Sequence, residues 1–188
     1  MINRIKRFIT MFKWRKYSKQ MKYCGKYSTV GKKCDVYGAE YISVGDHFYA
    51  MDNLKLQAYK SYCGIETGFT PNLKIGNHVS FMSNCLISCA NEIVIGDGTL
   101  FGDNVFITDN LHGSGKEEEL DIPPIERPLC IKGKIKIGKN VWIGRNVCIM
   151  PNVTIGDGAI IGANAVVTHN VPSKDVVAGV PAKSIKNK

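Results

Sequence analysis

A six-residue repeat is the feature of this 188-residue sequence that most limits its fold. Between residues 137 and 172 the chain can be written as six hexads, IGKNVW IGRNVC IMPNVT IGDGAI IGANAV VTHNVP. Each hexad begins with an aliphatic residue, and most have glycine next. Neither the 3.6-residue period of a helix nor the two-residue alternation of an ordinary strand keeps six such units in register.

The repeat has a direct structural meaning. Each hexad predicts one short strand and one tight turn, and three hexads make one triangular coil of a parallel β-helix. The first position and the small or β-branched fifth position point inward. Asn or Gly usually fills the fourth position, because these residues tolerate the positive φ of a tight turn. We therefore expect an all-β chain in which aliphatic side chains stack from coil to coil.

The same pattern begins less regularly near Val30, with small slips of phase that insertions at turns would absorb. One large break runs from Asp109 to about Lys134. Its segment GSGKEEELDIPPIERPL is charged, contains proline and lacks the repeat. We expect one long loop excursion over residues 109–134 within a β-helix domain that spans residues 26–188.

Residues 1–25 differ in composition from the rest. Their apolar residues between Ile2 and Phe12 recur at spacings of three and four, which predicts a basic amphipathic helix. Residues 1–33 hold 11 of the 25 Lys and Arg residues and no acid, so the remainder is slightly acidic. This uneven charge disfavours a nucleic-acid-binding protein. We expect the helix to pack on the β-helix; contact with an anionic membrane surface is the alternative.

The cysteines indicate a reducing compartment. There are seven, without a CxxC pair or a zinc spacing, and no stretch matches a signal peptide or a transmembrane helix. We expect a cytoplasmic protein with free thiols and no bound metal.

The hexads, the segment VWIG and the ending GVPAKSIK together resemble the hexapeptide-repeat acyltransferases over residues 30–186. The segment ITDNLHG is similar to that of sugar O-acetyltransferases in polysaccharide and lipopolysaccharide pathways. The resemblance implies a left-handed parallel β-helix, acetyl-CoA as the acyl donor, and a homotrimer with an active site at each subunit interface.

His112 is the catalytic residue that the resemblance implies. Imidazole titrates near neutral pH, so it suits the removal of a proton from an acceptor hydroxyl. Outside this context His112 would be taken for a solvated loop residue. Asp109 and Glu126 are candidates for orienting the ring, with a backbone carbonyl as the alternative. A covalent route through cysteine is disfavoured, because no cysteine has an evident histidine partner.

Several further site residues are expected. Asp109 and Asn84 are candidate substrate contacts, although Asn84 lies two residues from Met82, where relatives place an asparagine. Trp142 ends its hexad and points outward, which is typical of an interface or a ligand surface. The resemblance implies that it lines the channel for acetyl-CoA and acceptor; trimer packing alone is the alternative. A backbone N–H near Gly144 and Arg145 is the candidate donor to the oxyanion. The candidate contacts for acetyl-CoA, which follow from the resemblance, are Gly144, Arg145, Ala163, Thr168, His169, Lys183 and Lys186. A basic tail that faces solvent is the alternative for the two lysines.

The function that we expect is transfer of an acetyl group from acetyl-CoA to a sugar hydroxyl in polysaccharide or lipopolysaccharide biosynthesis. N-acetylation of an amino sugar or of a xenobiotic is an alternative. A trimeric β-helix scaffold without enzymatic activity is another; it would not need Trp142 or the basic tail, and it would tolerate the loss of His112.

Overall fold

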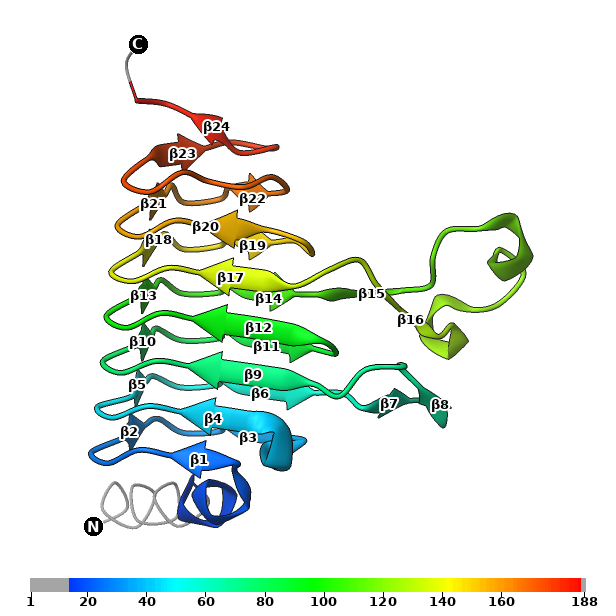
Figure 1. Cartoon of the computed structure of the whole chain (residues 1–188), viewed down its shortest axis with the longest axis horizontal. Coiled ribbons are helices and arrows are strands. Elements are labelled where there is room, and N and C mark those ends of the chain that lie inside the picture. Colours follow the sequence, from blue (N-terminus) through cyan, green and yellow to red (C-terminus); the bar gives the residue numbers. More distant parts are fainter. Residues whose placement is uncertain (1–13, 187–188) are drawn as a thin grey trace.

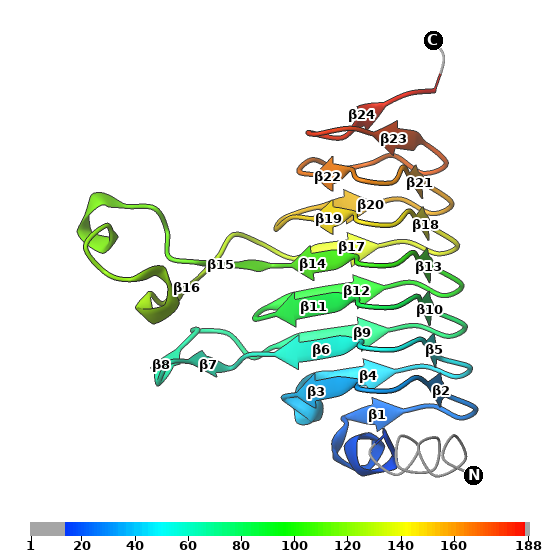
Figure 2. The same cartoon turned by 180° about the vertical axis from the view of Figure 1, so that it is seen from behind.

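The computed structural model describes residues 14–186. Its body is a triangular prism in which the chain winds through three parallel sheets, here called A, B and C (Figures 1 and 2). Each full coil adds one strand to each sheet in that order. The all-β class and the parallel β-helix predicted by the hexads are confirmed.

The strands are short. Sheet A contains β1 (Tyr23–Cys24), β4 (Ile42–Val44), β9 (Asn72–Ile75), β12 (Glu92–Ile95), β17 (Ile135–Ile137) and β20 (Thr154–Ile155). Sheet B contains β2 (Thr29–Val30), β5 (Tyr49–Ala50), β10 (Ser80–Phe81), β13 (Leu100–Phe101), β18 (Trp142–Ile143), β21 (Ile160–Ile161), β23 (Val176–Ala178) and the antiparallel β24 (Lys183–Ser184). Sheet C contains β3 (Asp35–Tyr37), β6 (Lys55–Ala58), β11 (Leu86–Cys89), β14 (Phe106–Thr108), β19 (Cys148–Ile149) and β22 (Val166–Val167).

The core is a set of side-chain columns along the prism axis. Phe81 and Phe101 stack at 4.2 Å between ring centroids, and Phe81 also packs against Phe48 at 5.9 Å. The first and fifth positions of the six hexads are buried from Ile137 to Val171. Burial of these apolar side chains stabilises each coil only when the next coil covers it, so the repeat specifies the stack.

The turns also follow the predicted chemistry. Asn140, Asn146, Asn152 and Asn164 occupy fourth positions with φ between 52° and 63°. At the corner between sheets B and C, side-chain amides join neighbouring coils at 2.8 to 3.0 Å. The members of this asparagine ladder, from the second coil upward, are Asn53, Asn84, Asn104, Asn146 and Asn164.

Two excursions leave the prism, whereas the sequence predicted one. Residues 59–71 form a lower arm with the antiparallel pair β7 (Ser61–Tyr62) and β8 (Ile65–Glu66). Residues 109–134 form an upper arm with β15 (Asn110–His112), two 3₁₀ turns (Glu117–Glu119 and Pro124–Glu126) and the antiparallel β16 (Leu129–Ile131). Both leave the corner between sheets C and A and extend to the same side (Figure 1).

The arms touch each other, since the Cys63 thiol donates to the Ile125 carbonyl at 3.4 Å. A third, smaller insertion, the 3₁₀ turn Ala39–Tyr41, occupies the same corner one coil below the lower arm. The sequence did not predict the lower arm, because this arm is short and, unlike the upper arm, has no run of charged residues.

A helix at residues 14–20 lies beneath the first coil. Trp14 stacks on Phe48 at 5.7 Å, and the Tyr17 hydroxyl donates to Asp35 Oδ1 at 2.9 Å. The first paired strand begins at Tyr23, so the β-helix starts within the segment 1–25 that was assigned to the helix. The predicted apolar stripe from Ile2 to Phe12 lies outside the described residues. Within residues 14–186, no helix has the length and apolar character needed to span a bilayer.

Candidate active site

A pocket of about 310 Å³ lies on the outer face of sheet C, where the two arms leave the prism. Its floor comes from the strands β6, β11 and β14, and its walls come from the two arms. The lining residues are Gln57, Tyr59, Tyr62, Leu86, Ser88, Phe106, Thr108, Asn110, Leu111, His112, Leu129 and Met150.

His112 stands in the wall of this pocket. It is the last residue of β15, opposite Leu129 of β16. The ring of Tyr62 in the lower arm meets the imidazole edge-on, with centroids 5.1 Å apart and an interplanar angle of 66°. Within the part of the chain that the structure describes, no hydrogen bond orients the imidazole, so this aromatic contact is the restraint on the ring that the structure provides.

Asn110 fixes the base of the upper arm. Its side-chain amide donates to the Ser88 carbonyl at 3.0 Å and to Ser88 Oγ at 3.1 Å, while the Thr108 hydroxyl donates to the Asn110 carbonyl at 2.7 Å. These bonds tie β15 to β11 in the coil below. The position of His112 is thereby set relative to the pocket floor. Asn110 and Ser88 were not among the site residues predicted from the sequence. The only signal for Asn110 was its place in ITDNLHG, and the only signal for Ser88 was its outward position in a strand.

Asp109 does not have the role predicted for it, which was to contact the substrate or to orient His112. Its side chain is completely buried, so it is not a substrate contact and does not orient His112. Its carboxylate accepts the N–H groups of Ala90 at 2.7 Å and Asn91 at 2.9 Å, and the side-chain amide of Asn110 at 3.0 Å. Asp109 therefore holds the turn of the coil below. Burial, together with this nearby carboxylate, raises the pKa of the Cys89 thiol.

Asn84 is also placed differently from the prediction. Both atoms of its amide are used in the asparagine ladder, and it lies at the corner between sheets B and C rather than in the pocket. Glu126, the other candidate for orienting His112, is exposed in the upper arm and does not line the pocket.

Four of the residues expected to contact acetyl-CoA lie on sheet B or at the far edge of sheet C from His112: Trp142, Gly144, Arg145 and Ala163. Trp142 projects from sheet B with 55% of its surface exposed. Gly144, Arg145 and Ala163 occupy the corner between sheets B and C. The Gly144 N–H donates to the Ile161 carbonyl at 2.8 Å, so of the two residues near which the sequence predicted an oxyanion donor, Gly144 is not available. A Cβ on Gly144 would lie 2.7 Å from the Ala163 nitrogen, so the coils approach closely here.

Arg145 differs from Gly144. At this corner the N–H of Lys32 donates to Asp52 Oδ1 at 2.7 Å in the coil above, and the N–H of Ser83 donates to Asp103 Oδ1 at 3.1 Å. Ala163 takes the corresponding place above Arg145, and its side chain has no hydrogen-bond acceptor. The Arg145 N–H accordingly has no hydrogen-bond acceptor in the described chain.

The other expected acetyl-CoA contacts, Thr168, His169, Lys183 and Lys186, are spread over three places. Thr168 follows β22 and lies one coil above Met150, on the face that holds the pocket, and its hydroxyl is 2.8 Å from Nδ1 of His169. Lys183 lies in β24 on sheet B. The Lys186 ammonium donates to the Lys174 carbonyl at the corner between sheets A and B. Residues 14–186 contain no group of three or more His, Cys, Asp or Glu residues that could hold a metal ion.

Comparison with known proteins identifies the family. Residues 134–169 match the model described as bacterial transferase hexapeptide (six repeats). The chain is 36% identical over 149 residues to a putative lipopolysaccharide biosynthesis O-acetyl transferase, WbbJ, of Escherichia coli (strain K12), an alignment that covers 77% of this chain and 71% of that protein.

Solved structures show the same fold. A variant of AntD, an N-acyltransferase from Bacillus cereus in complex with dTDP-4-amino-4,6-dideoxyglucose and coenzyme A, has a TM-score of 0.74 at 22% identity, covering 94% of this chain and 89% of that one. A galactoside acetyltransferase in complex with coenzyme A has a TM-score of 0.62 at 26% identity, covering 93% and 68%. These likenesses support the left-handed winding that the resemblance implied. From the hexad match and the 36% identical relative together, it follows that the chain belongs to the hexapeptide-repeat acyltransferases and is an acyltransferase.

Proposed function

We propose that this enzyme transfers the acetyl group of acetyl-CoA to a hydroxyl group of a sugar, with His112 as the general base. The observation that carries the proposal is the position of His112 in the wall of a pocket that is otherwise lined by tyrosines, by uncharged polar side chains and by apolar side chains, with no charged residue among the lining. Neutral hydrogen-bonding groups beside aromatic faces suit an uncharged polyhydroxylated acceptor. The relatives named as O-acetyl transferase and galactoside acetyltransferase support the same chemistry.

The reaction needs no covalent enzyme intermediate. The imidazole of His112 takes the proton of the acceptor hydroxyl as its oxygen attacks the thioester carbonyl of acetyl-CoA. The tetrahedral oxyanion collapses to the ester, and the C–S bond breaks. The proton held by His112 then neutralises the departing CoA thiolate. The Arg145 N–H, which lacks an acceptor, is the donor that we assign to the oxyanion.

This assignment requires more than one copy of the chain. The turn at Asn146 and the strand β19 separate Arg145, at the corner between sheets B and C, from Met150 at the pocket. One prism therefore keeps His112 apart from Arg145 and Trp142. In the homotrimer that we propose, the corner between sheets B and C of one protomer faces the His112 pocket of the next. The exposed Trp142 and Leu100 on the outer face of sheet B support such packing.

We propose that the enzyme acts in the assembly of a polysaccharide or lipopolysaccharide, and the relative from Escherichia coli supports this. The basic residues of the first 33 positions would suit the surface of an anionic membrane, where such glycans are built on lipid carriers.

The test is acceptor-dependent release of CoA thiol from acetyl-CoA with a panel of sugars, for the wild type, His112→Ala and a control, His78→Asn. His78 stacks on His47 at the corner between sheets A and B, and Asn tolerates its positive φ. We expect His112→Ala to lose at least about a hundredfold in kcat and the control to keep its activity. Unchanged release by His112→Ala would refute the role of the histidine.

The same assay separates the alternatives. Mass spectrometry of the product, with and without alkaline hydroxylamine, distinguishes an O-ester from an amide, which is stable to that treatment. An amide product would contradict O-acetylation. Absence of both acetyl transfer and CoA binding would favour a scaffold.

A further inference from the structure

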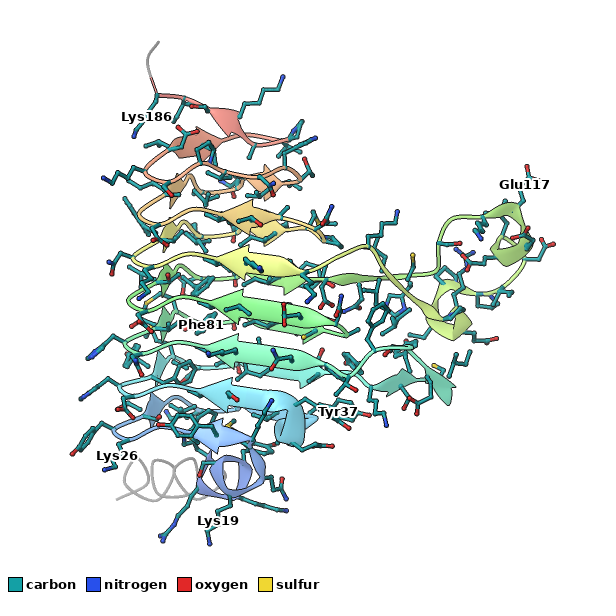
Figure 3. All side chains as sticks on the ribbon, in the orientation of Figure 1. Lys19, Lys26, Tyr37, Phe81, Glu117 and Lys186 are labelled. Atoms are coloured by element: carbon teal, nitrogen blue, oxygen red, sulfur yellow. The ribbon has the colours of Figure 1, made fainter. Side chains whose placement is uncertain are left out.

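The pocket continues downward along the prism as a line of aromatic rings. Tyr62 touches His112, the rings of Tyr62 and Tyr59 meet edge-on at 6.1 Å, and Tyr59 lies 5.1 Å from Tyr37. Tyr62 and Tyr59 line the pocket, but Tyr37 lies beyond its lower edge and exposes 53% of its surface. Figure 3 shows Tyr37 on the same side of the prism as the two arms.

The strand register places Tyr37 in line with the pocket floor. Tyr37, Gln57, Ser88 and Thr108 are successive partners on the outer face of sheet C. The three strand spacings between Tyr37 and Thr108 amount to about 14 Å, which exceeds the width of one pyranose ring. A single sugar held against His112 therefore leaves Tyr37 uncovered.

The chemistry of this line favours a neutral sugar. The C–H groups on one face of a pyranose pack on the electron-rich face of an aromatic ring. At the lower edge of the pocket, beside Tyr37, the Gln57 side-chain amide has no hydrogen-bond partner within residues 14–186, so its two donors and its acceptor are available to sugar hydroxyls. Burial, with smaller effects of Tyr37, Tyr62 and Asp35, raises the pKa of the Tyr59 phenol, so this hydroxyl stays neutral at physiological pH.

A nucleotide-linked sugar fits less well. The pocket lining contains no Lys or Arg, which a diphosphate would need for charge-assisted hydrogen bonds. The carboxylate of Asp35 lies close enough to Tyr59 to raise the pKa of its phenol, and that negative charge would repel a phosphate. The line of rings therefore suits a second sugar unit better than a nucleotide.

We propose that Tyr37, together with Tyr59 and Gln57 at the lower edge of the His112 pocket, forms a second sugar subsite, so that the acceptor is a glycan of at least two sugar units. This inference rests on the proposed sugar O-acetyltransferase activity and adds the length of the acceptor to it. The sugar that is acetylated lies against His112, and its neighbour in the glycan stacks on Tyr37.

The test compares methyl glycosides of glucose, galactose, rhamnose and N-acetylglucosamine with disaccharides that contain them, and includes UDP-glucose. The kinetic readout is kcat/KM for acetyl transfer by the wild type, Tyr37→Ala, Tyr37→Phe and Tyr23→Ala. Tyr23 is the matched control, because it is a similarly exposed tyrosine on sheet A. Binding of the same sugars without acetyl-CoA is followed by saturation-transfer NMR.

We expect the wild type to prefer a disaccharide over its monosaccharide, and Tyr37→Ala to reduce this preference about five- to tenfold through KM. Tyr37→Phe and Tyr23→Ala should keep it. Equal use of both acceptors by the wild type, or a preference unaffected by Tyr37→Ala, overturns the subsite and leaves the acetyltransferase standing. Disaccharide binding that depends on Tyr37 without any acetyl transfer refutes the proposed function alone. Loss of UDP-glucose use in Tyr37→Ala, or no binding or transfer with any disaccharide, overturns the subsite.

Discussion

Substitution of Asp109 by alanine tests whether this buried carboxylate is structural. Asp109 is the acceptor for the N–H groups of Ala90 and Asn91 in the coil below. Ala90 is completely buried, and its N–H would be left without a partner and without access to water. A buried donor that loses its acceptor costs about 1–3 kcal/mol, and Asn91 is only partly buried, so we expect Asp109→Ala to lower the free energy of unfolding by at least about 1–3 kcal/mol.

Asp157→Ala is the matched control. Asp157 also accepts one backbone N–H from the coil below, that of Lys139 at 2.7 Å, but this corner is exposed. Water can replace the carboxylate there, so the expected loss is below about 1 kcal/mol. Both carboxylates are exchanged for the same methyl group, so the difference between the variants reports the burial of the orphaned donors.

The assay is urea-induced unfolding followed by circular dichroism, with the free energy extrapolated to water. The explanation fails if the two variants differ by less than about 1 kcal/mol. It also fails if Asp109→Ala unfolds like the wild type but raises KM for the acceptor, because that result would restore the substrate contact that the structure rejects.

Three further predictions concern the arm contact, the asparagine ladder and the thiols. Tyr62→Ala should lower kcat about two- to tenfold, because an aromatic contact of about 0.5–1.5 kcal/mol no longer holds the imidazole; Tyr62→Phe should not, and equal kcat for both variants would contradict this. Asn104→Ala should be about 1–2 kcal/mol less stable than Asn104→Gly in urea unfolding, because φ is 58° at this position; equal stability would contradict the role of φ. Burial raises the pKa of Cys85 to about 11, so Ellman's reagent at pH 7.5 should label the exposed Cys63 in the native protein but not Cys85. The contribution of Cys85 to stability should be full below pH 9 and should decline as the pH rises toward 11.

The hexads determined the parallel β-helix. The bulky first residue and the small fifth residue of each hexad can both be buried only if each six-residue unit forms one side of a triangular coil. The asparagines of the fourth positions were equally predictable, since the required positive φ is a property of the single residue. The sequence also indicated that His112 lies in an excursion from the coil, because the repeat stops just before it.

The surroundings of His112 were decided only by the tertiary structure. Tyr62 lies 50 positions earlier in the chain, and it reaches the imidazole because both arms leave the same corner of the prism one above the other. Asp109 is a charged residue of the kind usually found in a solvated loop, but in the folded protein it is buried against the coil below. Asn84 and Trp142 lie at a different corner and on a different face from the pocket of their own prism, so within one copy of the chain they do not meet His112. A repeat specifies which side chains point inward; which outward side chains meet depends on where each insertion leaves the stack.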